Sequence, residues 1–525
     1  MHLFDLDPKE LPRQIKDGKV TLAIVGLGHV GLPLAVLLAS KGAKVVGCEL
    51  EGEYLNKLRK GVSPIVEHGS SRLGERVLDA TCPTCGVRIL HGGGDDFCPN
   101  CMKVAELKGA EVRLTGRSHR ILGADSGNEM ASLLSESLKA GRLSLTSDVS
   151  EAVTRSDVVI VCVGTPIDAR KRPDLRALIS AGNDIGRGLR EGTLVILKST
   201  VSPGTTEGVF APILERRSGL KRGVGFGLAH VPETTLEGLA LLGNRTLPKA
   251  VGGIDKRSSD LAAAVFRVFD VPVYTFRSPK ITEAAKLFQN IYRDVNVALA
   301  NELALATEAL GLDITEVLEA ARTEPKTHLL NPGPGVGGYC LPKDTYYLTD
   351  VATKQGFKPR MLYMARDINE RMPQHVVRLV KDAYAEAGIP VKGSVIAALG
   401  LSFKGNTADT RDTPSIPVIR RLAGLGMKVL LHDPLANPGT AVRGLKNVTF
   451  TKGLEDALGK ADALVLLTDH LEYRKMTGRT LSELAPELKV VVDTRHIFDP
   501  VDMARLNYTY RGVGRAGVKR RVRRP

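Results

Sequence analysis

The sequence predicts an α/β fold of two doubly wound parallel sheets, joined by a long central helix, with a small cysteine-rich insertion in the first half. Three observations support this prediction. Apolar strand-like runs alternate with helical segments in both halves of the 525-residue chain, as in parallel sheets covered by helices. The segment from Lys280 to about Leu310 is helical throughout, without internal Gly or Pro. Four cysteines stand in two closely spaced pairs.

The first sheet begins with the segment VTLAIVGLGHVGLPLAVLLASKGAKVVGCEL. An apolar strand runs into Gly26, Gly28 and Gly31, a helix follows, and a second strand ends at Glu49. Glycines in this pattern allow a tight turn, close approach of the backbone to a pyrophosphate, and close packing of helix on strand. An acid 18 residues after Gly31 is placed to bind an adenosine ribose, so the segment predicts a Rossmann-like domain that binds NAD rather than NADP.

Further strands end in polar loops that should lie at the same edge of the sheet. The runs SDVVIVCVGTP and GTLVILKSTVSPGTT end near Thr165 and Thr200, and FGLAHVPETTLEG supplies Glu233. Ligands of open parallel sheets bind beyond the carboxyl ends of the strands. These residues are therefore candidates for a ligand site. Cys48 and Cys162 lie inside apolar runs and are predicted to pack in the core.

The paired cysteines predict a zinc ribbon. The pattern is CPTCG, twelve residues, then CPNC, and two such knuckles can present four thiolates tetrahedrally to one Zn²⁺. The metal ligands would be Cys82, Cys85, Cys98 and Cys101. A redox or disulfide pair is the alternative interpretation. We interpret the segment as an insertion in a loop of the first domain.

Charge and hydropathy limit the classes of partner. The net charge is +15, which invites a nucleic-acid interpretation, but part of the excess lies in a basic tail that is typical of a solvated chain end. The insertion contains GVRILHGGGDDF, which has little basic density, so nucleic acid is not the expected partner. No apolar run approaches the roughly 20 residues of a membrane span. The mixed, polar beginning favours the cytoplasm.

One thiol stands in a setting suited to chemistry. The segment GPGVGGYCLPKD places Cys340 between a glycine-rich loop and charged residues, which allow close substrate approach and favour a thiolate. On the long helix, Lys286, Asn290 and Arg293 are spaced four and three apart and share one face. From about Val391, the strand and helix alternation resumes without GxGxxG, which predicts a second Rossmann-like domain.

In order and spacing, these motifs resemble the UDP-glucose/UDP-mannuronate dehydrogenase family, the nucleotide-sugar 6-dehydrogenases. The matching segments are the dinucleotide fingerprint, VGTP, STVSPGTT, PETTLEG, the helix with Lys286 and Asn290, GPGVGGYCLPKD, and LGLSFKGNTADTRDTP. The resemblance implies an NAD-binding domain over 1–278 with the insertion at about 79–128, a central helical catalytic and dimerisation domain over 279–385, a UDP-sugar-binding domain over 386–515, and a basic tail over 516–525. A homodimer through the central helix is implied as well.

The resemblance also implies the chemistry. Such enzymes oxidise the C6 alcohol of a nucleotide sugar twice, with two NAD, to a uronic acid. Cys340 would capture the aldehyde as a thiohemiacetal, and its oxidation would give a thioester that water hydrolyses. Lys286 and Asn290 would stabilise the oxyanions. Asp344 would assist proton transfer, while Glu233 and Thr200 would orient the water.

Binding residues carry over from the same motifs. The implied NAD-binding residues are Gly26, Gly28, His29, Val30, Gly31, Glu49, Thr165, Thr200 and Arg411. The implied substrate-binding residues are Lys286, Asn290, Arg293, Lys326, Gly337, Phe403 and Lys404. Glu49 stands where the family usually has aspartate, and its longer side chain should still bind the ribose diol.

The identity of the sugar stays open between two branches of the family. Arg293, Lys326 and PGPGVGGYC resemble the branch that acts on UDP-N-acetylhexosamines, notably UDP-N-acetylmannosamine. Thr234, in place of an arginine, and LPKD resemble the UDP-glucose branch. We favour UDP-N-acetylmannosamine because Arg293 adds a charge to the catalytic face of the helix. UDP-glucose and UDP-GlcNAc are the alternatives, and a zinc-ribbon nucleic-acid-binding protein on a dehydrogenase scaffold is a more distant one.

Overall fold

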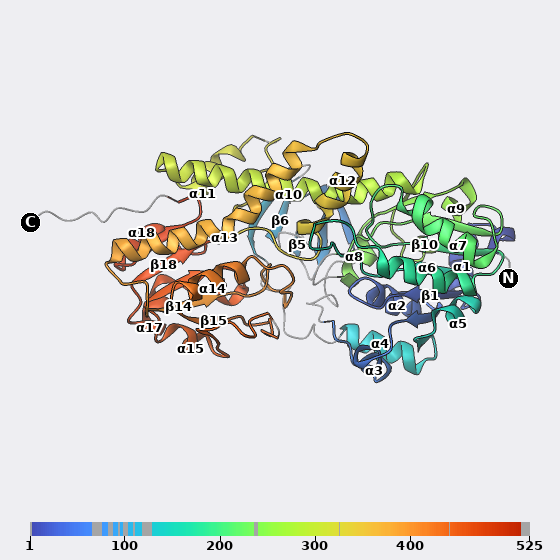
Figure 1. The fold of residues 1–525 in the computed structure, drawn as a ribbon, viewed down its shortest axis with the longest axis horizontal. Helices are drawn as coiled ribbons and strands as arrows, with labels where there is room; N and C mark the ends of the chain where they lie inside the picture. The colour runs from blue at the N-terminus through green and yellow to red at the C-terminus, as the bar shows by residue number, and fades with distance from the viewer. Residues whose placement is uncertain are drawn as a thin grey trace, which may run out of the picture. The chain divides into compact units, whose positions relative to one another are not determined.

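The structure is a computed structural model. It describes residues 3–65, 76–81, 88–92, 95–97, 103–108, 111–117, 129–235, 240–324, 326–439 and 441–515, and between 76 and 117 it describes only the strand backbone. The chain divides into two compact units. Unit 1 comprises Met1–Gln289 and Lys343–Lys358, and unit 2 comprises Asn290–Pro342 and Pro359–Pro525. Figure 1 labels their helices and strands.

Unit 1 is built on an eight-stranded sheet in the order β13-β12-β11-β10-β9-β1-β2-β8. The strands are β1 (Thr21–Val25), β2 (Lys44–Cys48), β8 (Leu143–Thr146), β9 (Val158–Val161), β10 (Thr193–Leu197), β11 (Phe226–His230), β12 (Lys249–Gly253) and β13 (Val273–Phe276). All neighbouring pairs run parallel except β11 with β12. The order reverses at β1, between β2 and β9, which is the topological switch point of a doubly wound sheet. The predicted fold class is confirmed.

The central strands of the unit 1 sheet are buried on both faces. Leu22 and Ile24 of β1 pack into the core cluster that includes α2 (Gly31–Ser40), α4 (Glu129–Lys139) and α9 (Lys256–Arg267). Ala23 and Val25 pack into the opposite cluster, with α5 (Val149–Thr154), α6 (Arg176–Gly188) and α7 (Ala211–Ser218). Side chains alternate between the faces of a strand, so a strand covered on both faces reads as a continuous apolar run. Short helices complete the unit: α1 (Leu11–Lys16), α3 (Glu53–Arg59) and α8 (Ala240–Thr246).

The cysteine-rich insertion contributes a separate antiparallel sheet to unit 1. Its five strands follow one another in space in chain order: β3 (Arg76–Thr81), β4 (Arg88–Gly92), β5 (Asp95–Phe97), β6 (Lys103–Lys108) and β7 (Glu111–Arg117). The predicted zinc ligands Cys82, Cys85, Cys98 and Cys101 lie outside the described residues. Among the residues that the structure does describe, no group of His, Cys, Asp and Glu side chains could hold a metal ion.

Unit 2 contains the second doubly wound sheet, in the order β16-β15-β14-β17-β18-β19. The strands are β14 (Val395–Leu399), β15 (Lys428–His432), β16 (Val448–Phe450), β17 (Ala463–Leu466), β18 (Val490–Asp493) and β19 (Thr509–Gly512). All pairs are parallel, and the order reverses between β15 and β17, on either side of β14. The connecting helices are α14 (Ser415–Gly424), α15 (Leu454–Leu458), α16 (Leu471–Arg474), α17 (Gly478–Leu484) and α18 (Pro500–Arg505).

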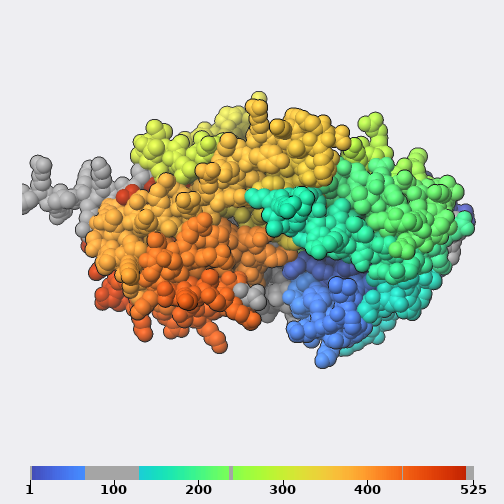
Figure 2. All heavy atoms as spheres, viewed as in Figure 1, coloured from blue at the N-terminus to red at the C-terminus, as the bar shows by residue number. Residues whose placement is uncertain are grey.

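The predicted long helix is confirmed as α10 (Pro279–Leu310), with 32 residues. It passes from unit 1 into unit 2 between Gln289 and Asn290. Within unit 2 it packs on α13 (Arg360–Ala387), where the buried Arg366 guanidinium lies 2.8 Å from the Asp294 carboxylate. The remaining helices are α11 (Ile314–Ala321) and α12 (Leu341–Lys354). In the space-filling view, α13 contributes to the visible amber surface of unit 2 (Figure 2).

No helix in the described part of the chain combines the length and the apolar character that crossing a bilayer requires.

Candidate active site

The glycine loop between β1 and α2 has the shape that the sequence predicts. Gly26 has a φ of +90°, and a Cβ at Gly31 would overlap the Gly26 carbonyl oxygen. These two positions therefore require glycine for steric reasons. At Gly28, by contrast, a Cβ would meet nothing within 4 Å. The backbone at Gly28 is open to a ligand, and α2 begins three residues later with its N-terminal amide groups at the same loop.

Glu49 lies at the end of β2 and is tied to this loop. Its carboxylate accepts hydrogen bonds from the backbone N–H groups of Leu27, at 2.7 Å, and Leu50, at 2.9 Å. The Tyr54 hydroxyl donates to the Leu27 carbonyl at 2.8 Å, so both backbone groups of Leu27 are held. A fixed, half-buried carboxylate beside an open glycine loop and a helix N-terminus fits the ribose and pyrophosphate of a dinucleotide.

The two threonine-bearing loops meet at the carboxyl edge of the sheet, as predicted. The Thr165 hydroxyl donates to the Thr200 carbonyl at 2.7 Å. Tyr347 of α12 donates its hydroxyl to the Thr165 carbonyl at 2.5 Å. On the same loop as Thr200, Gly204 donates its N–H to Glu283 of α10 at 2.5 Å. Side chains of α10 and α12 thus position both loops.

Glu233 is almost buried at the neighbouring end of β11 and pairs with Lys286, another candidate site residue. Its carboxylate lies 3.4 Å from the Lys286 ammonium and accepts the Thr235 N–H. Burial alone would raise the pKa of Glu233, but the charges of Lys286 and Lys198, together with the Thr235 hydrogen bonds, lower that pKa to about 2. The Glu233 carboxylate is therefore ionised at neutral pH.

Two lysines that the sequence analysis did not single out complete this cluster. Lys198 and Lys249 have no exposed surface. The Lys198 ammonium donates to the Pro232 carbonyl at 3.2 Å, and that of Lys249 donates to the Thr234 hydroxyl at 2.8 Å. Burial lowers the pKa of Lys249 to about 7. A charged residue directly after the apolar run LVIL was the available signal for Lys198.

The predicted residues at the start of α12 are buried, whereas Cys340, directly before it, is half-buried. Asp344 is 1% exposed and Lys343 is 4% exposed, and their charged groups lie 2.6 Å apart. The Lys343 ammonium also sits over the Tyr347 ring, 4.7 Å from its centroid. Lys343, to which the sequence analysis gave no role, is thus the ion partner of Asp344. Burial raises the pKa of Cys48 and of Cys162, the other two cysteines among the described residues, to about 12.

In unit 2, the glycine loop that precedes Cys340 packs against the loop after β14. A Cβ at Gly337 would lie 2.6 Å from Cβ of Phe403, and one at Gly338 would lie 2.8 Å from Cζ of the same ring. The Gly338 N–H donates to the Arg411 carbonyl at 3.0 Å. Glycine is required here because the two loops are in direct contact. Three of the predicted binding residues, Gly337, Phe403 and Arg411, are thereby brought together.

The remaining predicted residues of unit 2 are less closely grouped. Asn290 is buried and its amide oxygen accepts a hydrogen bond from the exposed Arg293 at 2.6 Å. Lys326 is exposed in the segment after α11, and its backbone N–H donates to Glu324 at 3.0 Å. Lys404 lies half-buried next to Phe403.

Comparison with known proteins identifies the family. A family profile described as the UDP-glucose/GDP-mannose dehydrogenase family, NAD binding domain, matches residues 20–81 and 126–270. The central-domain profile of that family matches 280–371, and its UDP-binding-domain profile matches 397–500. The chain belongs to the UDP-glucose/GDP-mannose dehydrogenase family.

Relatives in this family are similar over nearly the whole chain. The UDP-N-acetyl-D-mannosamine dehydrogenase of Pyrococcus horikoshii is 32% identical over 497 residues, which cover 95% of this chain and 100% of the relative. The UDP-N-acetyl-D-glucosamine 6-dehydrogenase of Pseudomonas aeruginosa is 30% identical over 486 residues, 92% of this chain and 98% of the relative. The prediction of an NAD-dependent UDP-sugar dehydrogenase is confirmed.

Solved structures agree with the fold. The UDP-D-ManNAc dehydrogenase from Pyrococcus horikoshii superposes with a TM-score of 0.76 at 31% identity, over 95% of this chain and 100% of that one. The UDP-glucose dehydrogenase from Pyrobaculum islandicum gives a TM-score of 0.74 at 28% identity, over 95% and 98%. Both sheets of this family member are therefore of the expected type.

Two further groups of this family member escaped the sequence analysis. Asp433 accepts the N–H groups of Leu401 and Ser402 at 2.7 and 2.9 Å and lies 3.0 Å from His470. It thereby holds the loop that carries Phe403. The Arg495 guanidinium donates to the Phe403 carbonyl at 3.4 Å. Both follow strands of the second sheet, in the HDP and DTRH segments.

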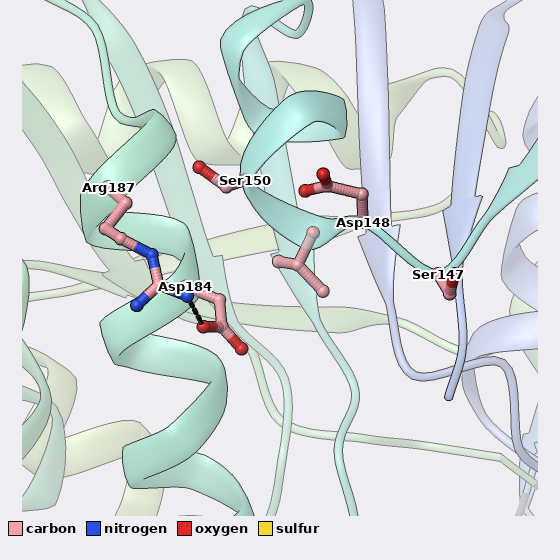
Figure 3. A pocket seen from close by; sticks show the side chains of 6 residues that line it. Ser147, Asp148, Ser150, Asp184 and Arg187 are labelled. Carbon is pink, nitrogen blue, oxygen red and sulfur yellow. Dashed lines mark hydrogen bonds and ion pairs between the residues drawn. The ribbon is translucent and has the colours of Figure 1, made fainter. Parts of the chain in front are cut away.

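A pocket of about 380 Å³ lies elsewhere in unit 1. Its lining side chains come from the start of α5 and from α6, where Arg187 is bonded to Asp184 (Figure 3). None of the predicted site residues lines it.

Proposed function

We propose that this enzyme oxidises UDP-N-acetylmannosamine to UDP-N-acetylmannosaminuronate. The observation that carries the proposal is the similarity to UDP-N-acetyl-D-mannosamine dehydrogenase of Pyrococcus horikoshii, in sequence over 95% of this chain and in fold. Arg293 supports the choice of an N-acetylhexosamine, because its guanidinium fixes the Asn290 amide and adds a charge beside it.

The reaction balances as a four-electron oxidation. A hydride leaves C6 of the alcohol, and its hydroxyl proton is released, to give an aldehyde. The Cys340 sulfur then adds to the aldehyde carbon while the thiol proton goes to the aldehyde oxygen. A second hydride leaves C6 of the thiohemiacetal, and its hydroxyl proton is released, to give a thioester. Water attacks the thioester, the carbon–sulfur bond breaks, and the thiol and the uronic acid are released. Bound NAD supplies the hydride acceptor, so the cycle consumes two NAD and one water.

Several of the side chains described above suit these steps. Lys286 is a buried cation that would stabilise an alkoxide or a tetrahedral oxyanion more strongly than a cation in water. Glu233, ionised and 3.4 Å from Lys286, would orient the hydrolytic water with Thr200. Asp344 would receive and return the protons of the thiol. Asn290, one turn along α10 from Lys286, would donate its amide N–H groups to the oxyanion.

Binding roles follow from the two loops described above. Glu49 would accept hydrogen bonds from the ribose hydroxyls. Gly26, Gly28, His29, Val30 and Gly31 would hold the pyrophosphate, and Thr165 and Arg411 would contact the rest of the dinucleotide. Phe403 and Lys404 would hold the UDP, and Arg293, Lys326 and Gly337 would contact the substrate.

UDP-N-acetylglucosamine is the second candidate, since a relative at 30% identity is the UDP-N-acetyl-D-glucosamine 6-dehydrogenase of Pseudomonas aeruginosa. The purified enzyme is given UDP-ManNAc, UDP-GlcNAc and UDP-glucose separately with excess NAD. The proposal expects the highest kcat/KM on UDP-ManNAc and two NADH per sugar. A preference of tenfold or more for another sugar would identify that sugar as the substrate instead. One NADH per sugar would contradict the thioester route.

A homodimer through α10 is part of the proposal. Five large apolar side chains of this helix are exposed: Phe288, Tyr292, Leu299, Leu303 and Leu310. At about 100° per residue these positions fall within roughly 60° of one another around the helix. An exposed apolar stripe of this kind favours a partner surface. Sedimentation of Tyr292→Glu and Leu299→Glu beside wild type tests it, and an unchanged dimer would contradict it.

A structural zinc in the insertion is proposed from its strands. Successive strands run antiparallel, so the β3–β4 and β5–β6 connections leave the sheet at the same end. In sequence, Cys82 and Cys85 belong to the first connection, and Cys98 and Cys101 to the second. One zinc per chain by metal analysis, lost in Cys98→Ser, would support the site. Salt-sensitive DNA or RNA affinity that requires the insertion would instead favour a nucleic-acid binder.

The cytoplasm is the proposed location, because a thiol nucleophile persists in a reducing compartment.

A further inference from the structure

Three consecutive residues of unit 1 are each held by a different buried lysine. Lys198 donates to the Pro232 carbonyl at 3.2 Å, Lys286 lies 3.4 Å from the Glu233 carboxylate, and Lys249 donates to the Thr234 hydroxyl at 2.8 Å. The lysines come from three separate elements: the residue after β10, the start of β12, and α10. The segment is therefore held from three directions.

The surroundings give this cluster an excess of positive charge. Among the residues that the structure describes, Glu233 is the carboxylate whose charge acts on Lys198 and Lys249, so three buried lysines face one carboxylate there. Neighbouring His230 does not add charge, because burial lowers its pKa to about 3. Buried ammonium groups are costly unless they are paired or hydrogen-bonded, and one lysine would suffice for a structural ion pair with Glu233. Two additional buried lysines call for another role.

The topology of the sheet explains how Lys249 reaches Glu233. Strand β12 runs antiparallel to β11, with Ala229 opposite Gly253 and His230 opposite Gly252. The first residue of β12 therefore lies at the edge where β11 ends. Were β12 parallel, like the other strand pairs of this sheet, Lys249 would lie at the opposite edge.

We propose that Lys198 and Lys249 are positioning residues for Glu233, and that they hold Pro232 and Thr234 so that the carboxylate stays charged and fixed beside Lys286. The inference rests on the proposed function, in which Glu233 orients the water that releases the acid. Neither lysine touches the reacting atoms in this proposal. Each acts through the residue next to Glu233 and through its charge.

A double-mutant cycle tests the proposal on the full enzyme. Lys249→Met should lower kcat about tenfold or more, with KM for NAD changed by less than about twofold, because the loss falls on a step after NAD binds. In the Glu233→Gln background, the same change should cost little further, since residues that act through one another are not additive. Equal losses in the two backgrounds would overturn the proposal.

Three further variants separate position from charge and from folding. At a pH below 7, where Lys249 is protonated, Lys249→Arg, which keeps a cation and donors, should recover part of kcat, whereas Lys249→Gln, which can still donate to Thr234, should not. Lys256→Met removes an exposed lysine of α9 that pairs with Asp260 at 2.6 Å and should leave kcat unchanged. If Lys249→Met does not fold, the Gln and Arg variants decide: equal activity of these two would contradict the role of the charge.

The covalent intermediate offers a readout that a merely structural role would not move. If Lys249→Met slows hydrolysis of the thioester, the intermediate should accumulate. Mass spectrometry of this variant mixed with NAD and UDP-ManNAc should then show an adduct on Cys340 that wild type lacks. If wild type makes no NADH from any of the three sugars, the proposed function fails. The positioning role is then judged by thermal unfolding of wild type and the three variants of the cycle, where coupling between Lys249 and Glu233 supports it and additivity refutes it.

Discussion

Lys249→Met should change how the stability of the protein depends on pH. Burial lowers the pKa of Lys249 from 10.5 to about 7 in the folded chain, whereas the unfolded chain keeps the ordinary value. Between these values the unfolded state binds a proton that the folded state does not, so this lysine makes wild type more stable as the pH rises. Below about pH 7 both states are protonated, and burial of the charge costs the most. Methionine at this position has no such dependence.

The size of the effect follows from the two pKa values. Between pH 6 and pH 9, the lysine adds about 2.5 kcal/mol to the free energy of unfolding of wild type relative to the Met variant, because one pKa unit corresponds to about 1.4 kcal/mol and the folded group loses its proton near pH 7. The other ionisable groups are present in both proteins and largely cancel in the difference.

Urea unfolding at pH 6, 7, 8 and 9 measures this difference. The free energy of unfolding of wild type minus that of Lys249→Met should grow steadily with pH, with most of the change above pH 7. Lys256→Met serves as the matched control, because its side chain is 89% exposed and its difference from wild type should be constant. A flat or falling difference for Lys249→Met would refute the reasoning that burial depresses the pKa of this lysine.

Other substitutions address the catalytic cysteine, the cofactor loop and the glycine contact. Cys340→Ser should abolish formation of the uronic acid, measured by NADH release and product mass, because serine forms no thioester; retained turnover to the acid would rule out the route. Glu49→Ala should raise KM for NAD about tenfold and leave KM for the sugar unchanged, since its carboxylate orders the Leu27 amide; equal changes in both would speak against a ribose contact. Gly337→Ala would place a Cβ 2.6 Å from Cβ of Phe403, so KM for the UDP-sugar should rise severalfold while Gly28→Ala, where a Cβ meets nothing, should affect NAD instead.

The fold could be predicted because its signals are local. The run LAIV in β1 is apolar at every position, since helices cover both faces, and the glycines after it are required by contacts within the same loop. The length of α10 could likewise be predicted from the sequence, because no Gly or Pro interrupts the helical segment. Such patterns can be recognised in a single sequence because each depends on residues that are close in the chain.

Contacts between distant segments were harder to predict. Asp433 holds the N–H groups of Leu401 and Ser402 across more than 30 positions, and nothing in the HDP segment alone indicates which loop it binds. Lys343 illustrates the same difficulty, because a lysine beside a helix start is usually exposed. Here it is buried against Asp344 and the Tyr347 ring.

Lys249 shows most clearly why the site could be predicted only in part. In the sequence it precedes an apolar strand, AVGG, and a doubly wound sheet of parallel strands would place it at the edge away from the ligand. The reversal of β12 against β11 is a property of the whole sheet and leaves no mark within the strand. The reversal of β12, whose direction β13 shares, brings a third buried lysine to the edge where Glu233 and Lys286 lie. The charge balance of the site therefore depends on topology as much as on the catalytic motifs, and the pH dependence of Lys249→Met measures that contribution directly.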